Sequence, residues 1–437
     1  MDDRRIAVIG LGYVGLPLAI AFAEAGRDVV GIDASPDRVA QLARGSSPID
    51  DIDDARLSAA LASGRFSVVE TDAATLADAD VVFVCVPTPI TGSKDPDLGA
   101  VTSAARRIAR ELQPGQLIVL QSTTFPGTTT GPFREALETG GQRAGADFDL
   151  AFAPERVNPG DPATASRAVP RLVGGTNPAA TKRAAAVLAS INEQVVELSS
   201  PDVAELAKLL ENVFRNVNIA LVNQLALLCE RMGLDVWEVI DAAATKPFGF
   251  MRFSPGPGVG GHCIPIDPYY LAWRAREFDF VDRFVELAGD INLAMPRYVV
   301  ELAAEALNER GRALRGAKVG VIGVAFKPDV RDARNAPAAA VIAGLVERGA
   351  EVTYHDPHVP RFVASDGTTL ASVPLDGLLE SSDLVVVVTP HKAIDWARLY
   401  DRAGLVVDTV NSSHARPVRE RQVLRLGAGW SPATAAS

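Results

Sequence analysis

Cysteine is scarce in this sequence, which has only three among 437 residues: Cys85, Cys229 and Cys263. Their odd number and wide scatter exclude a framework of disulfides, and the lack of a CxxC pair argues against a structural zinc site. Unpaired thiols of this kind are typical of a reducing compartment. We therefore expect a cytoplasmic protein without a metal centre.

Long apolar runs are missing as well. No run approaches the roughly 18 residues that a membrane span needs, and the charged N-terminus, Met1–Arg5, lacks the apolar stretch of a signal peptide. Positive charge is in deficit, because 43 Lys and Arg face 54 Asp and Glu. This balance argues against a nucleic-acid or membrane partner, but it is compatible with a local basic pocket for a phosphorylated ligand.

The whole chain of 437 residues is long enough for two or three domains. In its first part, strand and helix patterns alternate. Short apolar strands separated by helices imply parallel pairing in a doubly wound α/β sheet. The expected elements are the strands Ile6–Ile9, Val29–Ile32, Val81–Val86, Leu117–Leu120 and Leu150–Phe152, and the helix Leu16–Ala25.

A helical region follows, and then the α/β pattern returns. Pro201–Arg231 predicts a long helix, with one apolar stripe and with Asp202 and Glu205 opposing the positive end of its dipole. We predict two Rossmann-like domains, residues 1–198 and 311–437, joined by a helical region, residues 199–310. The stripe comprises Leu206, Leu209, Leu210, Val213 and Val217; the later elements are the helices Phe284–Arg310 and Ala338–Glu347 and the strands Val319–Ile322, Val352–Tyr354, Leu384–Val388 and Val406–Val407. The second domain lacks the glycine fingerprint of the first.

That fingerprint, Gly10-Leu11-Gly12-Tyr13-Val14-Gly15, follows the first strand and opens the first helix. Gly10 permits a tight turn, Gly12 lets the backbone approach a pyrophosphate, and Gly15 allows close helix packing. Asp33 ends the next strand, where a carboxylate accepts hydrogen bonds from the ribose of NAD and repels the 2′-phosphate of NADP. We therefore predict NAD, with NADP as an alternative because Arg38 is near.

Three further strands end in polar loops, at the sheet edge where open α/β folds bind ligands. Thr88 follows the third strand, Ser122–Thr128 forms a hydroxyl-rich turn after the fourth, and Glu155 with Arg156 follows the fifth. Cys85 is better explained as a small buried residue than as a nucleophile. Helix capping and a solvated ion pair are the structural alternatives for the turn and for the Glu–Arg pair.

The most unusual segment is the glycine-rich loop Pro255–Pro268. It brings Cys263 to an expected helix start, where the dipole favours the thiolate, and puts Asp267 one helical turn later. Lys208, Asn212 and Arg215 share a face of the long helix. The alternatives are a structural loop with a buried thiol and ordinary surface polarity on the helix.

The sequence resembles the UDP-glucose/GDP-mannose dehydrogenase family of nucleotide-sugar 6-dehydrogenases. The resemblance spans nearly the whole chain, in the blocks GLGYVG, CVPTP, STTFPGT, PER, KLLENVFRNVNIA, PGPGVGGHCIPIDP and GVAFKPDVRDAR. It implies an N-terminal NAD domain, a central region that forms a homodimer, and a C-terminal domain that helps to bind the nucleotide sugar.

The resemblance also implies a four-electron oxidation with two NAD. Cys263 would add to the aldehyde as a thiohemiacetal, which a second hydride loss converts into a thioester. Lys208 and Asn212 would stabilise the oxyanion, Asp267 and Glu155 would manage water and protons, and Thr123 would support an ordered water. The residues implied around NAD are Tyr13, Val14, Asp33, Arg38, Thr88, Thr123 and Arg334, and those around the UDP-sugar are Glu155, Arg156, Val157, Lys208, Asn212, Arg215, Gly260 and Lys327.

The chain departs from the family pattern at two positions: the first concerns a contact across the dimer, and the second bears on the substrate. Many UDP-glucose enzymes have an Arg sixteen residues before the cysteine, donated across the dimer, where this chain has Pro247. UDP-glucose and GDP-mannose members usually have Lys before the active-site Asp, where this chain has Ile266. The pattern is more similar to the branch acting on UDP-N-acetylhexosamines, and we expect UDP-N-acetylglucosamine first, then UDP-N-acetylmannosamine, then UDP-glucose.

Two other functions compete with this prediction. A two-electron dehydrogenase of the β-hydroxyacid kind shares the fold start and a helical Lys/Asn pair, but it needs no cysteine. A silent nucleotide-sugar sensor would lack a catalytic motif, and none is missing here. Uronate products commonly enter surface polysaccharide biosynthesis, which is the expected role of the product.

Overall fold

The computed structural model describes residues 3–49, 51–156, 168–261, 264–365 and 367–433. These form two compact units, each described here by itself. The first comprises Met1–Glu211 and Tyr269–Val281, and the second comprises Asn212–Pro268 and Asp282–Ser437. None of the helices in the described part of the chain combines the length and apolar character that crossing a membrane requires.

The first unit is built on an eight-stranded sheet of order β3-β2-β1-β4-β5-β6-β7-β8. All neighbours pair in parallel except β6 and β7, which are antiparallel. The predicted doubly wound sheet is therefore confirmed, and the five predicted strands pair in parallel. The antiparallel pair involves β7, a strand that the sequence did not predict. The described parts of the β6–β7 connection contain no crossover helix, which a parallel pair needs. The strands are β1 Arg5–Ile9, β2 Asp28–Asp33, β3 Phe66–Glu70, β4 Val81–Val84, β5 Leu117–Leu120, β6 Asp149–Phe152, β7 Arg171–Gly175 and β8 Val195–Leu198.

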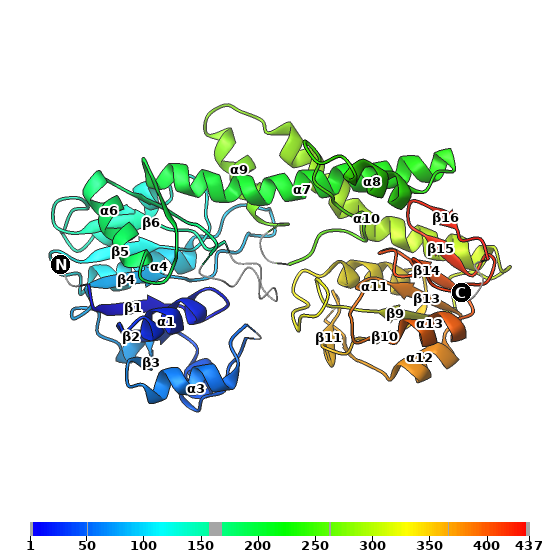
Figure 1. Cartoon of the computed structure of the whole chain (residues 1–437), viewed down its shortest axis with the longest axis horizontal. Helices are drawn as coiled ribbons and strands as arrows, with labels where there is room; N and C mark the ends of the chain where they lie inside the picture. Colours follow the sequence, from blue (N-terminus) through cyan, green and yellow to red (C-terminus); the bar gives the residue numbers. More distant parts are fainter. Residues whose placement is uncertain (1–2, 50, 157–167, 262–263, 366, 434–437) are drawn as a thin grey trace. The chain divides into compact units, whose positions relative to one another are not determined.

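Helices cover both faces of this sheet (Figure 1). Alternate residues of β1 point to opposite faces: Ile6 and Val8 pack in the core that includes α1, and Ala7 and Ile9 pack in the core that includes α4. The strands are buried on both faces, which explains their continuous apolar runs. The helices are α1 Gly15–Glu24, α2 Pro36–Ala43, α3 Asp54–Ala62, α4 Gly99–Ala109, α5 Arg134–Glu138 and α6 Pro178–Leu188, with short turns η1 Thr71–Ala73 and η2 Thr129–Phe133; α9 Asp267–Arg276 joins this unit from Tyr269 onward.

The second unit contains a six-stranded sheet of order β10-β9-β13-β14-β15-β16 and a two-stranded sheet of β11 and β12. The order β10-β9-β13-β14-β15 repeats the order β2-β1-β4-β5-β6 of the first unit, which confirms the second Rossmann-like domain predicted from the sequence. The strands are β9 Lys318–Ile322, β10 Glu351–His355, β11 Arg361–Val363, β12 Thr369–Ala371, β13 Leu384–Val387, β14 Val406–Asp408, β15 Val423–Arg425 and β16 Gly429–Trp430, and the helices are α8 Val236–Ala244, α10 Arg283–Asn308, α11 Pro337–Glu347, α12 Leu375–Ser381 and α13 Trp396–Arg402.

The long helix α7, Pro201–Met232, begins and ends close to the predicted positions (Figure 1). The prediction that its apolar residues form a single stripe was wrong. Leu209 and Val213 are buried, whereas Leu206 and Leu210 are exposed. The reason is that α7 has two apolar faces, only one of which packs within the described chain.

Candidate functional site

The glycine loop between β1 and α1 has the geometry that the fingerprint predicts. Gly10 has a φ of +91°, which favours glycine, and a Cβ there would lie 2.4 Å from the Cys85 carbonyl oxygen. A Cβ on Gly15 would lie 1.8 Å from the Gly10 carbonyl oxygen, so helix and loop can approach only without it. A Cβ on Gly12 would meet no described atom within 4 Å. Backbone at Gly12 is therefore open to a ligand, beside an α1 N-terminus that no side chain caps.

Asp33, at the end of β2, closes the loop from the other side. Its Oδ2 accepts a hydrogen bond from the Leu11 N–H at 2.9 Å, and its Oδ1 accepts from the Ser35 N–H at 2.9 Å. Arg38 forms an ion pair with Oδ2 at 3.2 Å. A carboxylate held beside the loop fits the ribose of NAD, and the pairing of Arg38 with it occupies the guanidinium that would otherwise favour NADP.

The loop after β4 is tied to α9. Tyr270 is fully buried, and its hydroxyl lies 2.8 Å from the Thr88 carbonyl oxygen and 3.0 Å from that of Pro89. Thr88 is buried, while Tyr13 and Val14 in the glycine loop are half-buried. Burial raises the pKa of the Cys85 thiol well above its usual range, which supports the prediction that Cys85 is no nucleophile. Sequence reasoning missed Tyr270 because its role depends on a contact across 182 residues.

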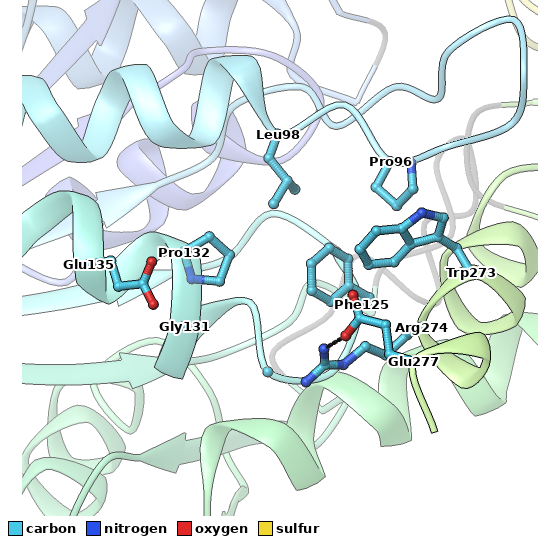
Figure 2. Close-up of a pocket in the computed structure, with 10 residues that line it drawn as sticks. Pro96, Leu98, Phe125, Gly131, Pro132, Glu135, Trp273, Arg274 and Glu277 are labelled. Carbon is cyan, nitrogen blue, oxygen red and sulfur yellow. Dashed lines mark hydrogen bonds and ion pairs between the residues drawn. The ribbon is translucent and has the colours of Figure 1, made fainter. Parts of the chain in front are cut away.

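The hydroxyl-rich turn after β5 is held on two sides. Thr123 is half-buried near its start. On one side, Phe125 packs against Trp273 of α9 with ring centroids 4.8 Å apart, beside the Arg274–Glu277 ion pair (Figure 2). On the other side, Glu205 of α7 accepts from the backbone N–H groups of the turn, as described below. The turn therefore does more than cap a helix.

Glu155 and Arg156 do not pair with each other through their side chains. Glu155 Oε2 lies 2.6 Å from Nη1 of Arg171, a buried residue of β7, and Arg156 Nη2 lies 2.5 Å from Oε1 of Glu211. The solvated Glu–Arg pair considered above is thus replaced by two separate ion pairs. Arg171 carries no sequence signal. Val157 lies outside the described residues.

The three polar residues of α7 differ in burial. Lys208 and Asn212 are buried, with exposed fractions of 9% and 6%, whereas Arg215 is exposed. Lys208 belongs to the first unit and Asn212 to the second. Burial of two polar side chains on an apolar helix face is costly unless each has a function or a partner.

Asn212 has such a partner in the second unit. Its Nδ2 donates to Oδ2 of Asp267 at 2.5 Å, and Asp267 is itself buried. Further along α7, Asn223 accepts from the Gly256 N–H at 2.9 Å and donates to Asn292 of α10 at 2.9 Å. Asn292 also donates to Asn216. Asparagines of α7 therefore anchor the glycine-rich loop at both ends, which sequence spacing alone did not reveal.

The predicted geometry around the cysteine needs correction. His262 and Cys263 lie outside the described residues. Helix α9 begins at Asp267, so Asp267 opens the helix and does not lie one turn inside a helix that starts at Cys263. The intervening residues 264–266 form a turn, for which Pro265 provides the reason.

Gly260 and Gly261 are required for packing. The sequence had suggested instead that these glycines let the backbone approach a ligand. A Cβ on Gly260 would lie 2.8 Å from Cδ of Pro337, and one on Gly261 would lie 3.0 Å from the Phe326 ring. Asn335 donates to the Gly261 carbonyl oxygen at 3.2 Å. The loop is therefore fitted against the segment after β9 within the second unit.

That segment carries the two basic residues predicted from the resemblance. Lys327 is half-buried next to Phe326, and Arg334 is exposed and pairs with both carboxylate oxygens of Asp332, the shorter contact being 2.6 Å. Both lie on the connection from β9 to α11, at the edge corresponding to the glycine loop of the first unit.

In the second unit Asp356 plays the structural part that Asp33 plays in the first. It follows β10, and its Oδ2 accepts from the Val324 N–H at 2.7 Å and the Ala325 N–H at 3.1 Å, in the loop after β9. His391 lies beside it, with Nε2 at 3.0 Å from Oδ2. The loop is thus held by a carboxylate without a glycine fingerprint.

A group near His391 has the composition of a metal site. Asp329, His358 and His391 place ligand atoms within 4.8 Å of one another. However, Nδ1 of His391 accepts from the Asp329 N–H at 2.9 Å and Nε2 faces Asp356, so this ring has no lone pair left for a cation. The contacts explain the group as a structural network.

Comparison with known proteins gives the family. The UDP-glucose/GDP-mannose dehydrogenase family matches this chain in its NAD binding domain at residues 4–194, its central domain at residues 202–294 and its UDP binding domain at residues 320–414.

Individual relatives match over most of their length. UDP-N-acetyl-D-mannosamine dehydrogenase of Pyrococcus horikoshii is 36% identical over 420 residues, 95% of this chain and 97% of that protein. UDP-N-acetyl-D-glucosamine 6-dehydrogenase of Pseudomonas aeruginosa is 35% identical over 401 residues, 90% and 92% of the two chains. The solved structure of the P. horikoshii UDP-D-ManNAc dehydrogenase has a TM-score of 0.89 at 34% identity and covers 97% of this chain and 99% of its own. The chain therefore belongs to the UDP-glucose/GDP-mannose dehydrogenase family, which confirms the predicted NAD-dependent nucleotide-sugar dehydrogenase.

Proposed function

We propose that this enzyme oxidises C6 of a UDP-N-acetylhexosamine to the carboxylate, with UDP-N-acetylglucosamine as the preferred sugar. UDP-N-acetylmannosamine is the second candidate, because relatives named for the two sugars are 35% and 36% identical to this chain. UDP-glucose is the third. Ile266 before Asp267 supports the hexosamine class.

The observation that best supports this type of reaction is the buried hydrogen bond between Asn212 and Asp267. Asp267 follows Cys263 by four residues in the sequence. An amide and a carboxylate held together out of water, directly after a cysteine loop, suit acyl chemistry on that thiol. The Cys263 thiolate adds to the C6 aldehyde as a thiohemiacetal, the second oxidation gives the thioester, and water releases the acid. NAD, when bound, would supply the hydride acceptor for both oxidations, so that two NAD are consumed per sugar.

We assign charge stabilisation and proton transfer to five further residues. Lys208 and the amide of Asn212 stabilise the oxyanion at C6, and Lys208 can also move the alcohol proton. Asp267 and Glu155 order water and receive protons, and Thr123 supports an ordered water. Glu155 is supported for this role by its 2.6 Å ion pair with buried Arg171, which fixes the orientation of the carboxylate.

The first unit fits NAD. Open backbone at Gly12 and the uncapped N-terminus of α1 would hold the pyrophosphate, and Asp33 would hold the ribose. We assign the remaining cofactor contacts, together with Gly10 and Gly15, to Tyr13, Val14, Arg38, Thr88, Thr123 and Arg334. We assign the UDP-sugar contacts to Glu155, Arg156, Val157, Lys208, Asn212, Arg215, Gly260 and Lys327.

The second copy in a homodimer is the proposed partner of α7. Seven apolar residues recur at helical spacing along one side of this helix and are exposed: Val203, Leu206, Leu210, Phe214, Leu221, Leu228 and Met232. A continuous apolar face of this length is what a helix buries against another helix. We retain residues 1–198, 199–310 and 311–437 as the NAD, dimerisation and nucleotide-sugar regions.

Counting NADH tests this function. The purified enzyme is incubated with NAD and each of the three UDP-sugars, and NADH formed per sugar consumed is measured. We expect a ratio of two with one preferred sugar. A ratio of one would favour the β-hydroxyacid type of reaction, and no turnover with any sugar would contradict the proposal.

The matched thiol variants are Cys263→Ser and Cys85→Ser. Cys263→Ser should stop acid formation, by at least roughly 10³-fold as for loss of a covalent nucleophile, and should leave NAD binding unchanged. Cys85→Ser should keep activity, because a hydroxyl can replace the thiol that donates to Gln121. Full acid formation by Cys263→Ser would exclude the thioester.

A further inference from the structure

Glu205 is a fully buried carboxylate that none of the proposed catalytic steps uses. It accepts three hydrogen bonds, all from one short segment: the Gly127 N–H at 2.7 Å, the Thr129 N–H at 2.9 Å and the Thr129 hydroxyl at 2.6 Å. Its position near the start of α7 suggested an interaction with the helix dipole. The contacts instead connect α7 to the hydroxyl-rich turn Ser122–Thr128, which carries Thr123, and to Thr129, which follows it.

The arrangement is costly without a purpose, because a buried charge is ordinarily paired with a cation. Among the described residues no ion pair involves Glu205. Burial raises the pKa of Glu205 to about 7, although the hydrogen bonds from Thr129 and Gly127 act in the opposite direction. Apolar residues would be sufficient to pack α7 against the turn. The backbone N–H groups of Gly127 and Thr129 both point at this side chain, however, and buried donors need an acceptor, which Glu205 provides.

We propose that Glu205 is a positioning residue: its carboxylate clamps the turn to α7 and so fixes Thr123 relative to Lys208. Lys208 follows Glu205 by one helical turn on α7, and Thr123 precedes Gly127 by four residues within the turn. All of these residues belong to the first unit. The inference rests on the proposed dehydrogenase function, in which Thr123 and Lys208 act on the same substrate carbon and its water.

Several charged groups surround the clamp. Asp202 of α7 accepts from the Thr130 hydroxyl at 3.2 Å and raises the pKa of Glu205 further. Lys208 follows on the same helix, and Glu135 of α5 lines the neighbouring pocket. From α9, Arg274 approaches Gly127 and is paired with Glu277 (Figure 2).

The test compares Glu205→Gln with a matched control, Asp202→Asn, one turn earlier on the same helix. Gln keeps the shape of the side chain but turns one acceptor into a donor that faces a backbone N–H. We expect kcat to fall at least tenfold in Glu205→Gln with KM for NAD changed less than threefold, and to stay within twofold in Asp202→Asn. A purely structural defect would instead lower the unfolding temperature of Glu205→Gln and raise KM for NAD together with the fall in kcat.

Hydrogen exchange of the Gly127 and Thr129 amides provides a readout that needs no turnover. Both should exchange at least tenfold faster in Glu205→Gln than in the wild type, and Thr129→Val should show a smaller increase. If Glu205→Gln has the kcat and the amide exchange rates of the wild type, the proposed clamp is wrong, while the dehydrogenase function is unaffected. If the wild type turns over no sugar, the function fails and exchange alone decides: unchanged protection would overturn the clamp.

Discussion

Gly12 and Gly15 lack side chains for different physical reasons, although both belong to one motif. Gly15 has no room for a Cβ, which would meet the Gly10 carbonyl oxygen at 1.8 Å. Gly12 has room in the described chain, and its missing side chain leaves space for a ligand instead. The motif thus combines one packing requirement with one binding requirement.

Alanine substitutions separate the two. Gly15→Ala should lower the free energy of unfolding by roughly 2–3 kcal/mol, as overpacking does, with loss of NAD binding as a consequence. Gly12→Ala should unfold at the wild-type temperature but raise the Kd for NAD at least tenfold. Thermal unfolding and NAD titration of both variants check this; a Gly12→Ala protein that binds NAD normally would contradict the proposed pyrophosphate position.

At the scale of elements, α7 shows what periodicity does and does not determine. Apolar spacing predicted the helix over Pro201–Arg231, close to the observed Pro201–Met232. It did not predict that Leu206 and Leu210 face out while Leu209 and Val213 face in. Two apolar faces that adjoin on one helix produce one broad stripe in the sequence, and only the packing partners divide it.

The outward face can be tested with a charge. Leu221→Glu places a carboxylate on an apolar residue that is 61% exposed, and we expect it to convert the proposed dimer to monomer in analytical ultracentrifugation. Val363→Glu, at an apolar residue of β11 that is 62% exposed, is the control and should leave the assembly unchanged. If the wild type sediments as a monomer, the second copy is not the partner of α7.

At the scale of the whole molecule, each unit has its own sheet and its own buried cores. Units of this kind unfold with some independence, so we expect two transitions in calorimetry. NAD at a hundred times its Kd should stabilise the first unit by about 2.7 kcal/mol, and UDP should act on the second unit. A single transition that both ligands raise equally would contradict separate binding regions.

The sequence by itself determined the α/β class, the long central helix, the NAD fingerprint and the family, because these depend on local spacing: strand-length apolar runs, helical periodicity and glycines at fixed offsets. Tertiary structure decided what depends on distant partners. Arg171 became the partner of Glu155, Asn212 the partner of Asp267, and Glu205 the acceptor of the turn. The contacts that hold the loop after β9 stayed hidden as well, because Asp356 accepts from backbone N–H groups that need no glycine motif. Contacts between residues far apart in the chain leave no periodic trace, so only the folded chain reveals them.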